Sequence, residues 1–202
     1  LDGGVTWKRL GDDPTRTTYD LPATIGKYSD ASLAIQRGVI YSIAPSYVDL
    51  NRIWIGTDDG VIKTTADGGL TWKDVTPPGL KPWMKVFNMD AGRFDARTAY
   101  AAVNTLRLDD MRPHLWRTHD GGATWKPINR GLKSEGIPDP NAEVGHCVHH
   151  IAMHRARPDV LFMQKHWDIM RSDDAGDTWR EVSGNLPTDF GFPIDVHAHE
   201  PE

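Results

Sequence analysis

One short element occurs four times in this chain, and it constrains the fold more than any other feature. Each copy reads Asp-x-Gly-x-Thr-Trp, and the copies occupy residues 2–7, 67–72, 120–125 and 174–179. Their Trp residues are 65 (7 to 72), 53 (72 to 125) and 54 (125 to 179) residues apart. A period near 53 residues fits one four-stranded propeller blade with its linker. The repeat therefore predicts stacked β-sheet units.

The chemistry of the element predicts a tight hairpin turn. Asp-Gly and Gly-Gly pairs permit the positive φ values that such turns require. The Asp carboxylate can accept N–H groups across its own turn, and the Thr then opens a strand that brings the Trp onto a buried blade junction. Ala175 replaces the usual Gly, so the fourth turn is expected to differ slightly. The residues expected to build the four turns are Asp2, Trp7, Asp67, Gly69, Thr71, Trp72, Asp120, Gly122, Thr124, Trp125, Asp174, Gly176, Thr178 and Trp179.

Short apolar runs separated by turn residues precede each element, which is the pattern of β-strands. In the first complete unit these runs cover residues 39–44, 52–56, 61–65 and 71–75, and the next two units repeat the order. No long amphipathic helix is indicated. We therefore predict an all-β chain, a β-propeller of four-stranded antiparallel blades belonging to a ring of six to eight blades.

The repeat also predicts where the blades lie. We expect a partial blade over residues 1–27, complete blades over about 28–80, 81–133 and 134–186, and the start of a further blade over 187–202. Residues 194–199 follow a Pro and read as the first strand of that further blade. The remainder of the ring is an expected partner, because three blades leave two sheet faces open.

The pattern Ser/Thr-x-Asp-x-Gly-x-Thr-Trp, with Thr65, Thr118 and Ser172 at its start, resembles the Asp-box (BNR) repeat. Proteins with that repeat include bacterial sialidases, xyloglucanase-type glycosidases, sortilin-type receptors and photosystem II assembly factors. The Gly-Asn-Leu-Pro segment at residues 184–187 is similar to the blade exit of bacterial BNR proteins labelled glycosyl hydrolases. The resemblance implies a propeller whose ligand site lies on the rim away from the boxes.

Composition limits the other function classes. A net charge of -5 without a basic block argues against a nucleic-acid partner, and no apolar run is long enough for membrane insertion. The single cysteine, Cys147, excludes an internal disulfide, which favours the cytoplasm without excluding export. No cofactor motif is present. His146, His150 and His166 match no standard metal spacing, so no metal is expected.

The rim opposite the boxes carries the groups that could bind a ligand. An exposed Trp beside His and Asp can stack on a sugar ring and hydrogen-bond its hydroxyls; the alternative is that this Trp packs on a linker and the charges are only solvated. The third complete blade has such a turn. The expected ligand-binding residues are Lys165, His166, Trp167, Asp168, His146, His150, Arg107, Arg112 and His114.

Two functions remain open from the sequence. The first is a binding propeller that holds a glycan or a protein on this rim. The second is a glycoside hydrolase, sialidase-like or xyloglucanase-like, which needs paired carboxylates. Asp168, Asp109 and Asp110 are the candidate catalytic acids, although spacing singles out none of them. The Arg-Ile-Pro signature that opens typical sialidases is absent.

Overall fold

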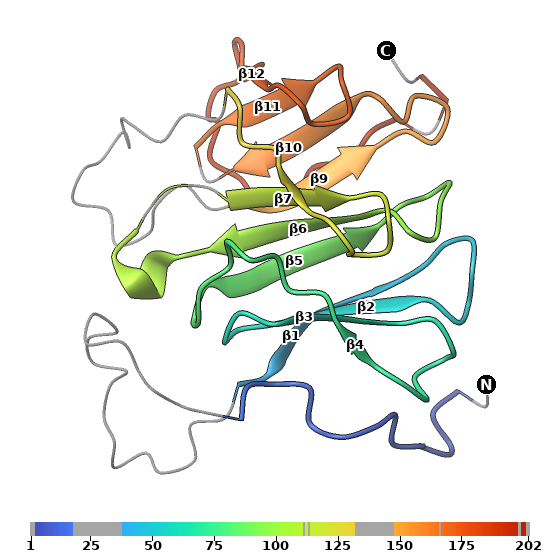
Figure 1. The fold of residues 1–202 in the computed structure, drawn as a ribbon. Helices are drawn as coiled ribbons and strands as arrows, with labels where there is room; N and C mark the ends of the chain where they lie inside the picture. Colours follow the sequence, from blue (N-terminus) through green and yellow to red (C-terminus); the bar gives the residue numbers. More distant parts are fainter. Residues whose placement is uncertain are drawn as a thin grey trace.

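A computed structural model describes residues 3–17, 38–110, 112, 114–131, 148–165, 167–197 and 199–200. Its regular structure consists of strands and one short 3-10 helix, Leu106–Leu108. The strands form three four-stranded antiparallel sheets, and in each sheet the spatial order follows the chain order (Figure 1). This confirms the predicted class, an all-β fold of four-stranded antiparallel blades.

Each sheet is one blade. The first contains β1 (Ile40–Pro45), β2 (Ile53–Thr57), β3 (Ile62–Thr65) and β4 (Lys73–Asp74). The second contains β5 (Lys85–Ala91), β6 (Ala99–Asn104), β7 (His114–Thr118) and β8 (Lys126–Pro127). The third contains β9 (Val148–Met153), β10 (Leu161–Lys165), β11 (Ile169–Ser172) and β12 (Arg180–Glu181).

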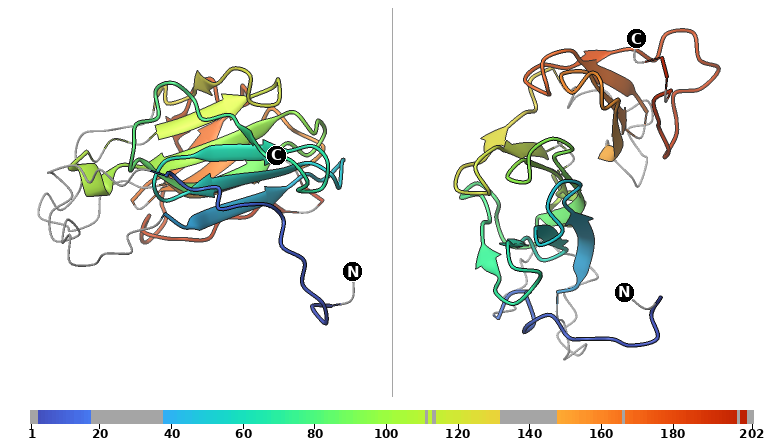
Figure 2. Two further views of the ribbon diagram at one scale, coloured as in Figure 1. Left: turned by 60° about the horizontal axis from the view of Figure 1, so that its bottom comes forward. Right: turned by 90° about the vertical axis from the view of Figure 1, so that its right-hand side faces the viewer.

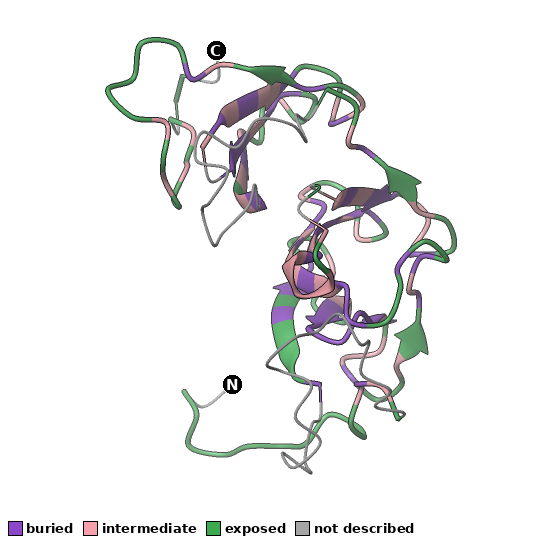
Figure 3. Cartoon of the chain, turned by 90° about the vertical axis from the view of Figure 1, so that its left-hand side faces the viewer, coloured by how far each residue is buried: buried purple, intermediate pink, exposed green. Residues whose placement is uncertain are grey.

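The three blades follow one another along an arc (Figure 2). The short last strands lie on its outer side and the first strands on its inner side, as in successive blades around a propeller axis. Buried residues concentrate on the strands where neighbouring sheets face each other (Figure 3). One apolar cluster, which includes Trp54, Ile62 and Val86, joins the first and second blades; another, which includes Leu115, Ile128 and Met163, joins the second and third. The core is therefore built between blades.

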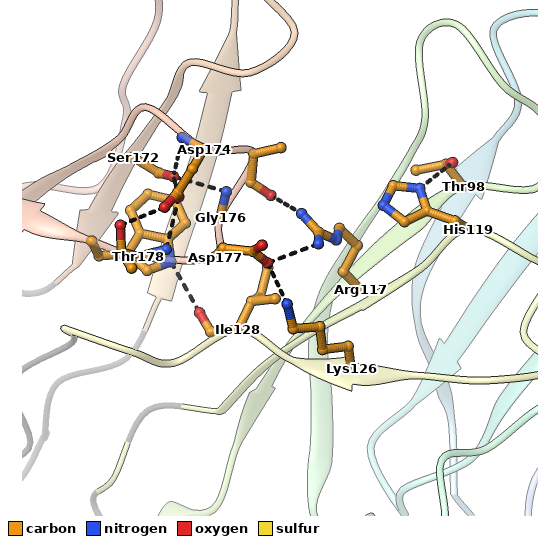
Figure 4. Close-up of polar contacts among 12 residues, drawn as sticks. Thr98, Arg117, His119, Lys126, Ile128, Ser172, Asp174, Gly176, Asp177 and Thr178 are labelled. Carbon is orange, nitrogen blue, oxygen red and sulfur yellow. Dashed lines mark hydrogen bonds and ion pairs between the residues drawn. The ribbon is translucent and has the colours of Figure 1, made fainter.

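The repeated element forms the same turn, here called the Asp turn, between the last two strands of every blade. In the third blade, Thr178 donates from its backbone N–H to Asp174 Oδ1 at 2.7 Å and from its hydroxyl to Oδ2 at 2.6 Å (Figure 4). The Ser172 hydroxyl donates to Asp174 and accepts the Gly176 N–H at 2.8 Å. The Asp turns at residues 67–72 and 120–125 repeat these bonds. Ala175 keeps the left-handed conformation, with φ 54°, so the fourth turn retains the shape of the others.

The Trp of each Asp turn ties its blade to the one before it. The indole N–H of Trp179 donates to the Ile128 carbonyl at 3.0 Å, and that of Trp125 donates to the Val75 carbonyl at 2.6 Å. Trp72 makes the same bond to Leu10 at 2.9 Å. Each acceptor stands three residues after the preceding Trp. Segment 3–17 therefore meets the first blade as an earlier blade would.

A second tie joins the second and third blades beside this bond. The Arg117 guanidinium, from β7, donates to the Ala175 carbonyl and to the Asp177 carboxylate, the latter at 2.8 Å (Figure 4). Lys126 reaches the same carboxylate at 2.7 Å, and these cations lower the pKa of Asp177. The Asp turn thus acts both as a hairpin and as a contact between blades.

Three expectations need correction. The fourth strands span two residues each, because Thr71 and its equivalents bond to the turn Asp instead of to a neighbouring strand. Trp7 is 91% exposed, since no blade precedes it in the described part of the chain. The described residues of segment 194–199 form no strand, because none of the strands in the described part of the chain pairs with them. Asp2 lies outside the described residues, and the predicted blade boundaries stay a prediction.

The Asp turns predict a loss of stability in acid. Hydrogen bonds from Thr124 and Thr178 lower the pKa of Asp120 and of Asp174 from 3.8 to about 2. Because the folded pKa values are depressed, the stabilisation is present above pH 4 and is lost as the pH falls toward 2. We expect the midpoint of thermal unfolding to fall across this range. In the D120N/D174N variant, the midpoint should be lower at pH 7 and change less in acid; pH profiles of equal slope for the two proteins would contradict this.

Candidate functional site

The two ends of the blades differ, and the Asp turns mark one of them. The β1–β2, β5–β6 and β9–β10 connections lie at the Asp-turn end, as shown by the bond from the Gly121 N–H to the Arg97 carbonyl at 2.9 Å and its equivalents in the other blades. The β2–β3, β6–β7 and β10–β11 connections therefore lie at the opposite end, together with the first residues of β1, β5 and β9. We call this end the far rim.

A row of aromatic rings follows the first strands near the far rim. Tyr41, Phe87 and His149 come from β1, β5 and β9, and each occupies the same position, a β-bulge where one residue is skipped in the pairing with the second strand. A bulge turns a side chain away from the regular alternation of a strand and is common near active sites. All three blades thus use the same irregularity to place a ring on the inner side of the arc.

The row continues from the first strands to the segment that follows β12, and it ends at Trp167 in the β10–β11 connection. The Tyr41 and Phe87 ring centroids are 5.7 Å apart, and those of Phe87 and His149 are 6.5 Å apart. His149 stacks on Phe192 at 4.3 Å with an interplanar angle of 9°, and its Nδ1 lies 2.8 Å from the Gly191 carbonyl oxygen. Phe192 contacts Phe190 at 5.6 Å, and Phe190 contacts Trp167 at 5.1 Å. The aromatic row is therefore defined as Tyr41, Phe87, His149, Phe192, Phe190 and Trp167.

The rings of the row are partly exposed to solvent, and a cation lies against two of them. Tyr41 is 46% exposed, Phe190 42% and Phe192 56%, whereas the other three rings are half-buried. The Lys85 ammonium lies 3.5 Å from the centroid of the Tyr41 ring and 5.2 Å from that of Phe87, within the range of a cation–π contact. The row thus offers a partly exposed apolar surface with a cation at one end.

Of the predicted site residues, Trp167 joins the aromatic row and several others form ion pairs among themselves. Arg107 donates to Asp58 at 3.1 Å, which ties the β6–β7 connection to the first blade. Arg112 binds Asp110 at 2.7 Å and lowers the pKa of that carboxyl well below its usual range. His114 lies 3.6 Å from Asp110, and burial lowers the pKa of the imidazole. None of these side chains is among the ring contacts that define the row.

Lys165 and Asp168 form an ion pair inside the third blade. The Lys165 side chain is 0% exposed, its ammonium lies 3.1 Å from the Asp168 carboxylate, and the Asp168 side chain is 11% exposed. The Lys165 N–H also donates to the Asp168 carbonyl at 2.9 Å, which closes the turn that carries Trp167. We assign this pair to support of the turn; its direct contact with a ligand stays a prediction.

The remaining predicted residues are dispersed. Asp109 is exposed, with φ 55°, at the end of the 3-10 helix, and His150 faces a cavity between the second and third blades. His166 and His146 lie outside the described residues. Within the described residues, no three His, Cys, Asp or Glu side chains are placed to hold a metal ion, and no helix is long and apolar enough to cross a membrane.

Comparison with known proteins finds a xyloglucanase of similar sequence. Xyloglucanase Xgh74A of Acetivibrio thermocellus is 24% identical over 191 residues, covering 90% of this chain and 22% of that protein. The chain therefore spans about a fifth of the length of the curated relatives that it matches. No family model matches the sequence.

Solved structures agree on the fold. An ancestral GH74 enzyme superposes with a TM-score of 0.55 at 15% identity, covering 73% of this chain and 19% of that one. The GH74 enzyme of Niastella koreensis gives 0.53 at 13% identity, covering 74% of this chain and 23% of that one. The three sheets are blades of a β-propeller, and the relatives of the chain include β-propellers of the glycosyl hydrolase type.

Proposed function

We propose that these blades belong to an Asp-box (BNR) propeller that binds a polysaccharide along the aromatic row of its far rim. The observation that carries the proposal is the row itself, with Tyr41, Phe87 and His149 at the same bulge in successive blades. The apolar faces of sugar rings pack on aromatic side chains, while polar groups nearby fix their orientation. Because the row extends along the arc instead of enclosing a pit, it suits an extended chain better than a single sugar.

The Asp-box assignment rests on the turns. The Asp turns share their hydrogen bonds, their positive φ values and the Trp contact to the preceding blade. Local geometry of this kind is a property of the fold and does not by itself assign an activity. The ligand is therefore inferred from the far rim, and the name of the xyloglucanase relative points to xyloglucan as the first ligand to test.

A glycoside hydrolase is the second candidate, because the curated relative is a xyloglucanase. Hydrolysis requires two carboxyl groups on either side of the scissile bond. Asp110 and Asp168 are held by Arg112 and Lys165, which leaves Asp109 as the exposed candidate among the three. An enzyme of this type would need a second carboxylate from elsewhere in a ring of six to eight blades. Release of reducing ends from xyloglucan tests this alternative, and sialosides and other glycosides extend the assay.

Replacing Trp167 with alanine is expected to weaken xyloglucan binding about tenfold, since one stacking ring at the end of the row is lost. Isothermal titration calorimetry on the protein measures the change, and Phe192→Ala should have a comparable effect. Trp7→Ala is the matched control because Trp7 is an exposed Trp outside the row. Equal affinities of Trp167→Ala, Phe192→Ala and the unmodified protein would contradict the proposal.

A further inference from the structure

A polar cavity lies between the second and third blades, and no residue of the aromatic row lines it. Its volume is about 210 Å³, and β5, β6 and β9 contribute Asn88, Asp90, Tyr100 and His150 to its wall. Tyr47 and Arg93 also line it, from the β1–β2 and β5–β6 connections at the Asp-turn end of the blades. We call this cavity the junction pocket.

The equivalent junction between the first and second blades is closed by small side chains. Ala44 pairs with Trp54 in the first blade as Asp90 pairs with Tyr100 in the second, and Ser42 corresponds in the same way to Asn88. Ala44 is buried, and the Ser42 hydroxyl accepts the Met89 N–H at 2.8 Å. Where the first junction has Ala44 and Ser42, the second therefore has the carboxylate of Asp90 and the amide of Asn88. Because the first two blades pack without these larger polar groups, we infer that Asp90 and Asn88 serve a purpose other than blade packing.

The groups in the junction pocket are arranged around Asp90. The Tyr47 hydroxyl donates to Asp90 Oδ1 at 3.3 Å, and the Arg93 guanidinium lies 4.5 Å from the centroid of the Tyr47 ring. Burial raises the pKa of Asp90, against the opposing effects of Arg93, Tyr47 and His150. One carboxyl thus lies among cationic, phenolic and amide groups, so the pocket has both donors and acceptors and little net charge.

We propose that the junction pocket binds a single neutral monosaccharide. Hydroxyl groups both donate and accept, so a sugar can satisfy Asp90, Asn88 and Arg93 together, and the Tyr rings offer faces for its C–H groups. The volume corresponds to about seven waters, which is enough for one sugar ring. This site is distinct from the proposed polysaccharide site, because none of the row residues lines the pocket and Tyr47 and Arg93 extend it toward the Asp-turn end.

The test uses glucose, galactose and xylose as probes, with saturation-transfer NMR on the protein. At least one sugar is expected to bind, with a Kd on the order of 1 mM. Asp90→Ala, which copies the natural Ala44 of the first blade, should weaken binding about tenfold. Tyr47→Phe, which removes only a hydroxyl, should weaken it several-fold. Trp167→Ala should leave monosaccharide binding unchanged, and xyloglucan should not displace the sugar.

Three outcomes would overturn the proposal. They are no binding of any of the three sugars, unchanged binding in both Asp90→Ala and Tyr47→Phe, and stronger binding of glucuronate than of every neutral sugar. Loss of binding in Trp167→Ala together with full binding in Asp90→Ala would move the sugar to the aromatic row. Failure of the polysaccharide proposal would appear separately, as an unchanged affinity of Trp167→Ala for xyloglucan. That result would not affect the monosaccharide proposal for the junction pocket.

Discussion

Replacing Gly122 with alanine is expected to destabilise the protein by about 2–4 kcal/mol. Gly122 has φ +83°, and an added Cβ would lie 2.6 Å from Val75 Cβ and 2.9 Å from each of its methyl groups. The variant would therefore combine backbone strain with a steric overlap at the junction of the first two blades. Chemical denaturation followed by Trp fluorescence measures the loss.

Gly121→Ala is the matched control, one residue away in the same turn. Gly121 also has a positive φ, +76°, but the nearest heavy atom to its added Cβ would be Arg52 Nη1 at 4.0 Å. Ala175 occupies the equivalent position of the third blade with φ 54°. Strain alone is expected to cost about 1 kcal/mol there. Equal losses in the two variants would show that contact with Val75 does not explain the requirement for glycine.

Replacing Asp168 with alanine is the second change with a large expected effect, a loss of about 3–5 kcal/mol. Lys165 is fully buried, and its ammonium lies 3.1 Å from the Asp168 carboxylate. Removal of the carboxylate would leave a buried charge without this partner, which costs far more than loss of an exposed pair. Thermal and chemical unfolding of the two proteins at pH 7 test the prediction.

The double variant K165M/D168A separates support from ligand contact. Removal of both charges should recover most of the stability, because an apolar side chain then fills the Lys165 site. If Asp168→Ala unfolds like the unmodified protein yet loses xyloglucan binding, the carboxylate contacts the ligand and our assignment of the pair is wrong. If xyloglucan binding is weakened in Asp168→Ala but restored in K165M/D168A, the carboxylate acts by supporting the turn that carries Trp167.

The blades could be predicted from the sequence because the Asp turn is a local structure. Thr118, Asp120, Gly122 and Thr124 lie within seven residues of the chain, and their bonds close inside that segment. The strand at residues 194–199 could not be predicted in the same way, since a strand forms only when another strand pairs with it. The prediction that Trp7 is buried was wrong for a related reason, because its expected contact needs a preceding blade.

The candidate site was only partly predictable. Trp167 was expected on the far rim, but the positions of Tyr41, Phe87 and His149 depend on bulges that no alternating pattern reveals. Alignment of the first strands offers a signal, since Tyr41, Phe87 and His149 each follow an apolar residue and precede a polar one. The charged residues of the far rim were expected to face a ligand. Several of them instead form pairs within the protein, as Arg112 does with Asp110, because sequence spacing does not show which charges will meet.

The bond from each Trp to the carbonyl three residues past the previous Trp defines a natural unit for rearranging such a chain. A segment cut just after Val75 and again just after Ile128 carries one Trp donor and one carbonyl acceptor. If copies of that segment were joined head to tail, the Trp-to-carbonyl bond would connect each copy to the one before it. A cut placed between a Trp and the third residue after it would instead leave Val75 and Trp125 in the same segment, so that the bond would form within one copy and would not join it to the next. We therefore expect duplicated blades to begin and end just after the acceptor residue.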